Sequence, residues 1–162
     1  MARLQYKDIS KIRAKNKNKK IVFCSGGFDL THAGHLIFLE NCKKLGDILV
    51  VGIGPDKIIK KEKGNERPII NEDLRLKMVE ALKPVDWAFI LTPKPKPGEH
   101  PLSPLEEIVV KLDPDIYVIN DDAGHPEYRK AMMKKIGVKF VVLKRVFPIS
   151  TTSIIEKIKN IR

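Results

Sequence analysis

The sequence predicts an α/β fold in which one five-stranded, mostly parallel sheet carries helices on both faces. Short apolar runs rich in β-branched residues alternate along the chain with segments whose apolar residues recur at helical spacing. Strands that alternate with helices favour parallel pairing, with helices covering both sides of the sheet. The chain has 162 residues and no internal repeat, so we expect a single domain of ordinary size.

Five apolar runs have the length and composition of buried strands. The first ends at Gly26 and Gly27, and the second ends at Gly54 and Pro55, where the chain is expected to turn. The expected strands are residues 21–25, 48–53, 87–91, 116–119 and 139–143.

Helices are expected between these strands and after the last one. The first helix ends at Gly46, and the second begins after Asn71, a favoured N-cap residue. Apolar residues mark their buried faces, namely Leu36, Leu39 and Leu45 in the first and Leu74, Met78, Val79 and Leu82 in the second. Three further helices are expected at residues 105–112, 126–136 and 152–161.

Two connections lack a regular apolar pattern. Residues 57–64 are basic and are expected to form a mobile loop or a short helix. Residues 93–104 contain five of the eleven prolines, which predicts an exposed connection.

The net charge of +11 is concentrated at the N-terminus. Residues 1–20 hold eight basic residues and one acid, so they supply +7, and the other 142 residues supply +4. We therefore expect a basic N-terminal arm, 1–20, followed by the domain proper, 21–162. Such an arm could contact nucleic acid or an anionic surface, or it could be a solvated helix. No aromatic residue lies between Lys7 and Lys20 to stack on bases, so nucleic acid is not an expected partner.

The sequence indicates a soluble, reduced, cytoplasmic protein. No apolar run approaches the ~18 residues that a membrane helix needs, and no secretory signal is visible. The two cysteines, Cys24 and Cys42, argue against a disulfide scaffold and against a four-ligand zinc site.

The loop after the first strand carries the strongest chemical signal. In parallel α/β sheets a ligand binds beyond the carboxyl ends of the strands, which directs attention to the loops after Ser25, Ile53 and Ile119. The first of these reads GGFDLTHAGH over residues 26–35. Its glycines let the backbone approach a ligand, and His32 and His35 lie at the start of a helix, where unpaired N–H groups favour anions. This combination predicts a phosphate site.

Other interpretations of this loop fit less well. A dinucleotide fingerprint needs G-x-G-x-x-G, and a nucleotide P-loop needs G-K-[ST]; neither occurs. A metal site built on His32 and His35 would need a third ligand such as Asp29, and no further His or Cys cluster supports it.

The loop resembles the G-x-F-D-x-x-H-x-G-H signature of the cytidylyltransferase-like nucleotidyltransferases. Further segments resemble the same family in the same order over about residues 21–161. They are KKLGDILVVGI, the group Lys60, Lys63, Gly64, Arg67 and Pro68, the segment 73–86 with Arg75, and RVFPISTT at 145–152. The resemblance implies a Rossmann-like fold and transfer of a nucleoside monophosphate from a nucleoside triphosphate to a phosphorylated small molecule, with release of pyrophosphate.

The resemblance also implies roles for individual residues. His32, His35, and Lys60 or Lys63 would act on the phosphates as catalytic residues. Asp56 and Arg75 would serve the acceptor or the loop. The residues implied in nucleotide binding are Gly26, Gly27, Phe28, Asp29, Gly34, Asp122, Arg145, Ser150, Thr151 and Thr152. Mg²⁺ is expected as the counterion of the triphosphate, without a dedicated protein site.

Two parts of the sequence resemble relatives that use different nucleotides. Residues 56–87 resemble adenylyl-transferring members, namely the heptose-1-phosphate adenylyltransferase domain and the archaeal FAD synthetase. The segments from Ile119 onward resemble glycerol-3-phosphate and choline-phosphate cytidylyltransferases, although Val146 and Pro148 replace the Thr and Gly of that pattern. We expect ATP and a sugar or polyol phosphate, with CTP and glycerol-3-phosphate as the alternative.

Two further hypotheses come from different classes. The chain could bind a nucleotide without catalysis, which the presence of both histidines and the Ser-Thr-Thr segment disfavours, or it could bind nucleic acid through its basic N-terminus. Relatives are commonly dimers, so a homodimer is a candidate assembly.

Overall fold

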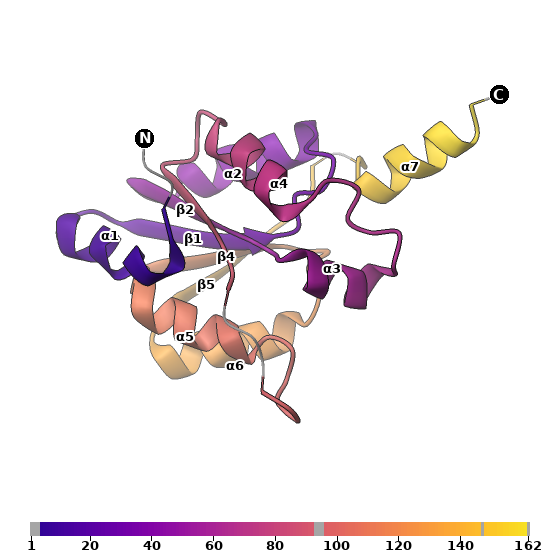
Figure 1. Ribbon diagram of the computed structural model, residues 1–162. Coiled ribbons are helices and arrows are strands. Elements are labelled where there is room, and N and C mark those ends of the chain that lie inside the picture. The colour runs from indigo at the N-terminus through magenta and orange to yellow at the C-terminus, as the bar shows by residue number, and fades with distance from the viewer. Residues whose placement is uncertain (1–3, 93–95, 147, 162) are drawn as a thin grey trace.

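Over the described residues, the protein has one sheet of five parallel strands. The computed structural model describes residues 4–92, 96–146 and 148–161 (Figure 1). The strand order is β3-β2-β1-β4-β5, and every described pair is parallel. The strands are β1 (Ile21–Gly26), β2 (Ile48–Ile53), β3 (Trp87–Ile90), β4 (Ile116–Asn120) and β5 (Lys139–Leu143). The predicted strands and fold class are confirmed, with shifts of one residue at some ends.

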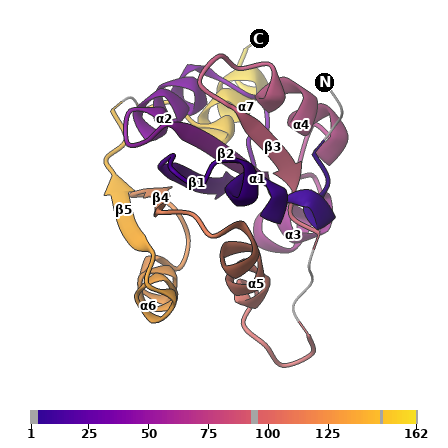
Figure 2. The same cartoon turned by 90° about the vertical axis from the view of Figure 1, so that its left-hand side faces the viewer.

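Helices cover both faces of the sheet. In Figures 1 and 2, α2 and α4 lie on one face and α1, α5 and α6 lie on the other, while α3 and α7 lie near the carboxyl ends of the strands. The helical elements are the 3₁₀ turn η1 (Tyr6–Asp8) and the helices α1 (Ser10–Lys15), α2 (Ala33–Lys43), α3 (Asp56–Lys63), α4 (Glu72–Glu80), α5 (Ser103–Leu112), α6 (Pro126–Ile136) and α7 (Thr151–Lys159). None of the helices within the described ranges is long and apolar enough to cross a membrane.

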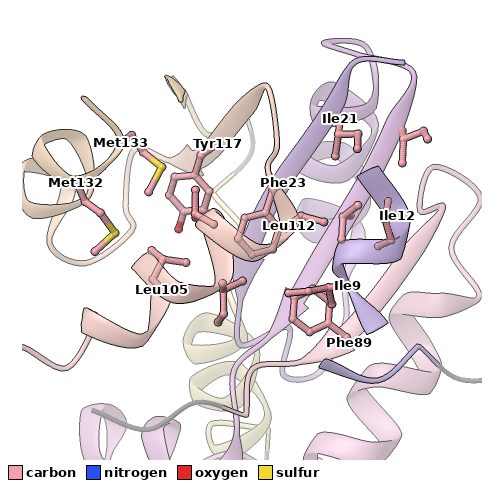
Figure 3. Packing of buried hydrophobic residues seen from close by; sticks show 14 of the residues in the cluster. Ile9, Ile12, Ile21, Phe23, Phe89, Leu105, Leu112, Tyr117, Met132 and Met133 are labelled. Atoms are coloured by element: carbon pink, nitrogen blue, oxygen red, sulfur yellow. The ribbon is translucent and has the colours of Figure 1, made fainter. Parts of the chain in front are cut away.

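Alternate residues of the central strands build two separate cores. Val22 and Cys24 face α2 and α4, whereas Phe23 faces α1, α5 and α6. The ring of Phe23 lies 6.2 Å from that of Phe89 and 5.5 Å from that of Tyr117, measured between centroids (Figure 3). The central strands β1 and β2 are buried on both faces and are almost entirely apolar, so polar groups gather at the ends of the strands.

The N-terminal segment packs against the domain, which differs from the expectation of an arm. Ile9 and Ile12 are 0% and 3% exposed and belong to the core that contains Phe89 (Figure 3). Arg13 donates to the carbonyl oxygen of Asp113 and to the carboxylate of Asp115, the latter at 2.7 Å. The described part of residues 1–20 is therefore an amphipathic segment whose lysines face solvent while its isoleucines are buried.

The second and third helices after β1 were only partly predicted. The basic segment at 57–64 was expected to be a mobile loop or a short helix, and it forms most of helix α3. The N-cap role of Asn71 is confirmed, because its side-chain oxygen accepts the N–H of Leu74 at 3.0 Å. The expected burial of Leu74 and Met78 is wrong: they are 54% and 50% exposed. The buried face of α4 contains Arg75, Leu76 and Val79 instead.

The ends of the last helices also differ slightly from the sequence prediction. Helix α5 begins at Ser103, so Pro104 lies in its first turn, where a missing N–H costs nothing. The exposed connection expected before it is observed at residues 96–99, and residues 93–95 lie outside the described ranges. Helix α7 begins at Thr151, one residue earlier than expected.

Candidate active site

A cavity of about 470 Å³ opens at the carboxyl ends of β1 and β4. Its walls come from the loop after β1, the first turns of α2 and α7, the end of α3, and the loops after β4 and β5. These are the parts of an open parallel sheet where a ligand site is expected.

Most residues singled out from the sequence lie in this cavity. Those that line it are Gly26, Gly27, Phe28, Asp29, His32, Gly34, His35, Lys63, Asp122, Arg145, Ser150, Thr151 and Thr152. Lys60, Asp56 and Arg75 are not among the lining residues. Of the two lysines between which the sequence could not choose, Lys63 is thus the one that lies at the cavity.

The two imidazole rings of the loop are stacked. Their centroids are 3.9 Å apart and their planes differ by 24°. The Nδ1 atom of His32 accepts the N–H of Gly34 at 3.1 Å, and the Nδ1 atom of His35 accepts the N–H of His32 at 3.4 Å. A neutral imidazole that accepts at Nδ1 carries its hydrogen at Nε2. Both histidines are therefore set to act as Nε2–H donors.

Burial keeps both imidazoles neutral near pH 7. It lowers the pKa of His32 below its usual range. Burial, followed by electrostatic interactions with His32 and Lys63, lowers the pKa of His35 to about 4. The pair thus offers two neutral hydrogen-bond donors to an anion.

Gly34 lets the segment before α7 lie close to the first turn of α2. A Cβ atom at this position would lie 2.9 Å from Cγ2 of Ile149 and 3.0 Å from the ring of His32. The small residue thus lets the segment before α7 close over the first turn of α2. The loop that precedes it is constrained as well, since Phe28 and Leu30 have φ angles of 50° and 44°, which non-glycine residues seldom adopt. Phe28 also packs against His35, with ring centroids 5.3 Å apart.

Asp29 ties the loop to the segment before α4. Its carboxylate accepts Nε of Arg67 at 2.8 Å and the backbone N–H groups of Ile69 and Ile70 at 3.0 Å. Burial raises the pKa of Asp29, but these hydrogen bonds outweigh burial and hold the pKa below its usual value. The contacts favour a role in holding the loop, since the carboxylate oxygens are already occupied.

Arg75 holds the same loop from inside the protein. Its side chain is fully buried and donates to the carbonyl oxygens of Gly27, Gly54 and Ile70. It also donates to the carboxylate of Asp56 at 2.8 Å. Of the two roles expected for Asp56 and Arg75, these contacts favour support of the loop. Because the carbonyl of Gly27 points inward to Arg75, the N–H of Phe28 in the same peptide unit points the other way.

The first turn of α7 closes the cavity on the side of α2. The side chain of Ser150 caps the helix by accepting the N–H of Ser153 at 3.0 Å. The hydroxyl of Thr151 donates to the carbonyl oxygen of Asp29. Thr152 is exposed at the rim of the cavity. Two helix N-termini, those of α2 and α7, thus open on one space, and each favours negative charge.

Polar residues from the loops after β4 and β5 complete the cavity. The guanidinium of Arg145 lies 3.1 Å from the carboxylate of Asp122, and both side chains are partly exposed. No group of three or more His, Cys, Asp or Glu residues in the described ranges is placed to hold a metal ion.

Some lining residues were not predicted from the sequence as site residues. They include Ser25, Asn41, Glu62, Asn120, Arg129 and Lys144. Ser25 ends a strand and Arg129 belongs to a helix with several other basic residues, so neither stands out in the local pattern. The signal that identifies them is contact between distant parts of the chain, which the fold alone supplies.

Comparison with known proteins agrees with the geometry. The cytidylyltransferase-like family matches residues 23–157. The bifunctional protein HldE of Campylobacter jejuni subsp. doylei is 37% identical over 150 residues, which covers 90% of this chain and 29% of that protein. HldE of Desulfatibacillum aliphaticivorans is 32% identical over 152 residues, covering 90% and 28%. The chain thus spans less than a third of the length of these relatives.

Solved structures show the same fold. The lipopolysaccharide core biosynthesis protein from Thermoplasma volcanium GSS1 has a TM-score of 0.61 and 28% identity, covering 79% of this chain and 97% of that one. Pantoate-beta-alanine ligase from Francisella tularensis has a TM-score of 0.64 at 18% identity, covering 99% and 79%, and supports the fold alone. Together with the two histidines and the helix N-termini around one cavity, the family match shows that the chain belongs to the cytidylyltransferase-like family.

Proposed function

We propose that the protein transfers AMP from ATP to a sugar phosphate and releases pyrophosphate. The relatives named HldE support the adenylyl alternative, to which the sequence of residues 56–87 already pointed. The observation that carries the proposal is the stacked pair His32 and His35, whose Nε2–H groups can donate to phosphate oxygens at the N-terminus of α2.

The reaction is a substitution at the α-phosphorus. A phosphate oxygen of the acceptor forms a bond to that phosphorus, the bond between the α- and β-phosphates breaks, and pyrophosphate leaves with its electron pair. Little covalent chemistry is needed from the protein, so positioning and charge stabilisation supply the rate. His32 and His35 would donate to the phosphate oxygens as negative charge moves to the leaving group. The N–H of Phe28, the first turn of α7 and Lys63 would hold the remaining oxygens.

Magnesium would enter with the nucleotide. The carboxylate of Asp29 is engaged by Arg67 and by backbone N–H groups, and that of Asp122 forms an ion pair with Arg145. The phosphates themselves and water supply the hard oxygen ligands that Mg²⁺ prefers. The cation would neutralise charge on the leaving pyrophosphate.

The proposal is tested by measuring pyrophosphate release with Mg²⁺. ATP and CTP are each combined with heptose-1-phosphate, glycerol-3-phosphate, phosphocholine, FMN and phosphopantetheine. We expect turnover with ATP and heptose-1-phosphate. Turnover with CTP alone would replace the adenylyl assignment by the cytidylyl one. Nucleotide binding without turnover in any combination would favour a binding protein.

His32→Ala is expected to lower kcat by about 10²–10³-fold, because one donor to the developing charge is lost. The matched control is His125→Ala, which removes an exposed imidazole outside the cavity lining and should leave kcat unchanged. Equal activity of the His32 variant and the wild type would contradict the assigned role.

The homodimer expected from the resemblance stays a prediction.

A further inference from the structure

Arg129 differs from the other arginines in the described ranges by having no carboxylate partner. Arg13, Arg67, Arg75 and Arg145 each form an ion pair with an aspartate. Arg129 is partly buried and lines the cavity, yet its recorded partners are neutral oxygens. A partly buried cation that lacks a counter-ion in the protein is suited to an anionic ligand.

The guanidinium of Arg129 is held in place from two sides. Its Nε donates to the carbonyl oxygen of Gly124 at 2.9 Å, and one Nη1–H donates to the hydroxyl of Tyr117. A guanidinium has five N–H groups, so three have no partner recorded within the described ranges. Anchoring of this kind fixes the direction of the free donors before a ligand arrives, which lowers the entropic cost of binding.

The same network frees the hydroxyl of Ser25 as a donor. Tyr117 is fully buried, and its hydroxyl oxygen lies 3.0 Å from Oγ of Ser25. Arg129 can only donate to this oxygen, and a buried hydroxyl needs an acceptor for its own hydrogen, so we assign Tyr117 as the donor to its neighbour Ser25. The hydrogen of Ser25 is then left for a ligand, and Ser25 lies at the cavity wall. Arg129 and Ser25 therefore both offer donors to the cavity.

Arg129 lies on α6 and the two histidines lie at the start of α2, and these two helices cover opposite faces of the sheet. Thr152 lies at the start of α7, near the carboxyl ends of the strands (Figure 1). In an in-line substitution the attacking oxygen approaches opposite the leaving group. With pyrophosphate leaving beside the histidines, a phosphate held by Arg129 would approach from the side of α6.

We infer that Arg129, together with Ser25, binds the phosphate group of the acceptor substrate. The inference rests on the proposed function, because it takes the leaving pyrophosphate to lie beside the two histidines. The ligand class is a phosphate monoester dianion, held by charge-assisted hydrogen bonds from the guanidinium and by one from the serine hydroxyl.

The test compares Arg129→Gln with Lys130→Gln, which removes an equal charge from the next, exposed position of the same helix. With Mg²⁺, ATP and heptose-1-phosphate, the Arg129 variant should raise the KM for the acceptor by about 10–100-fold and leave the KM for ATP within about 3-fold. Ser25→Ala, a smaller change, should raise the acceptor KM by about 3–10-fold. The control variant should change neither constant.

Other results would overturn the inference. A raised KM for ATP with an unchanged acceptor KM would place Arg129 at the nucleotide, and unchanged constants in both variants would remove it from the site. If Arg129→Gln does not fold, Ser25→Ala carries the same comparison. If the wild type shows no turnover, the proposed function fails, and calorimetric titration with heptose-1-phosphate decides the inference separately. Binding that weakens in Arg129→Gln supports it, and binding that is equal in both proteins, or absent from the wild type, refutes it.

Discussion

His35 shows how burial sets the charge of a single residue in the cavity. Its ring packs against both Phe28 and His32, and its pKa falls to about 4. A charged imidazole here would compete with Lys63 for the same anion and would lose solvation. The neutral form instead keeps one defined donor at Nε2, so the orientation of the ring, and not its protonation, prepares it for phosphate.

This depressed pKa predicts a loss of stability on mild acidification. The unfolded chain binds a proton at His35 below pH about 6.5, whereas the folded chain binds it only near pH 4. Unfolding therefore takes up a proton within this window, and the free energy of unfolding should decrease as the pH falls from 7 to 5. Urea unfolding at both pH values measures the effect. This decrease in the free energy of unfolding should be smaller in His35→Gln than in the wild type, and as large as in the wild type in His125→Gln. Identical decreases in the wild type and both variants would show that His35 is not the cause.

Individual site residues were predictable where they share one short segment. Gly26, Gly27, His32, Gly34 and His35 lie within ten consecutive positions, so their proximity follows from the sequence itself. The hydrogen-bonded chain from Arg129 through Tyr117 to Ser25 joins distant positions, since Tyr117 and Ser25 are 92 residues apart in the sequence. No local pattern encodes such a contact, because it arises only when β1 and β4 pair.

At the level of elements, α1 and α4 show why the apolar pattern was incomplete. The lysines of residues 1–20 dominate the composition, and Ile9 and Ile12 are too few to produce a clear period. In α4 the fully buried Arg75 takes the place that an apolar residue usually has, so the buried face is rotated away from Leu74 and Met78. A charged residue inside the core is not visible to a method that reads apolar spacing.

The packing of α1 and of its N-cap residue predicts that Ile12 and Ile9 stabilise the whole domain. Ile9→Ala removes a fully buried side chain and should lower the free energy of unfolding by about 2–5 kcal/mol. Lys15→Ala, in an exposed position of the same helix, should change it by no more than about 0.5 kcal/mol. Denaturant titration of both variants gives the comparison. Equal stability of Ile9→Ala and the wild type would mean that the segment acts as a detached arm after all.

For the molecule as a whole, the positive charge and the cavity are separate features. The lysines at positions 15, 17, 19 and 20 are exposed, whereas the cavity is lined by residues from position 25 onward. Deleting residues 1–20 would not test the charge alone, since it would also remove core residues. The apolar pattern predicts the strands but not their spatial order, which is seen only in the structure, where β1 pairs with both β2 and β4.

Replacing Lys15, Lys17, Lys19 and Lys20 by Gln together tests the role of the charge. We expect kcat and both KM values to stay within about 2-fold of the wild type, because the changes lie outside the cavity lining. Any salt-sensitive binding to DNA or RNA should disappear with these charges. Pyrophosphate release and a nucleic-acid titration at two salt concentrations measure the two effects. A large loss of activity would show that the basic segment takes part in catalysis.

The central position of β1 also bears on how the chain folds as it is synthesised. Its partner on one side, β2, follows soon after it, but on the other side Val22 pairs with Ile116. Until β4 has been made, that edge of β1 is unpaired, and an open apolar edge can pair with other chains. The core that contains Phe23 is likewise incomplete until α5 and α6 have been synthesised. We therefore expect fragments that end before β4 to aggregate, although they contain the phosphate-binding motif intact.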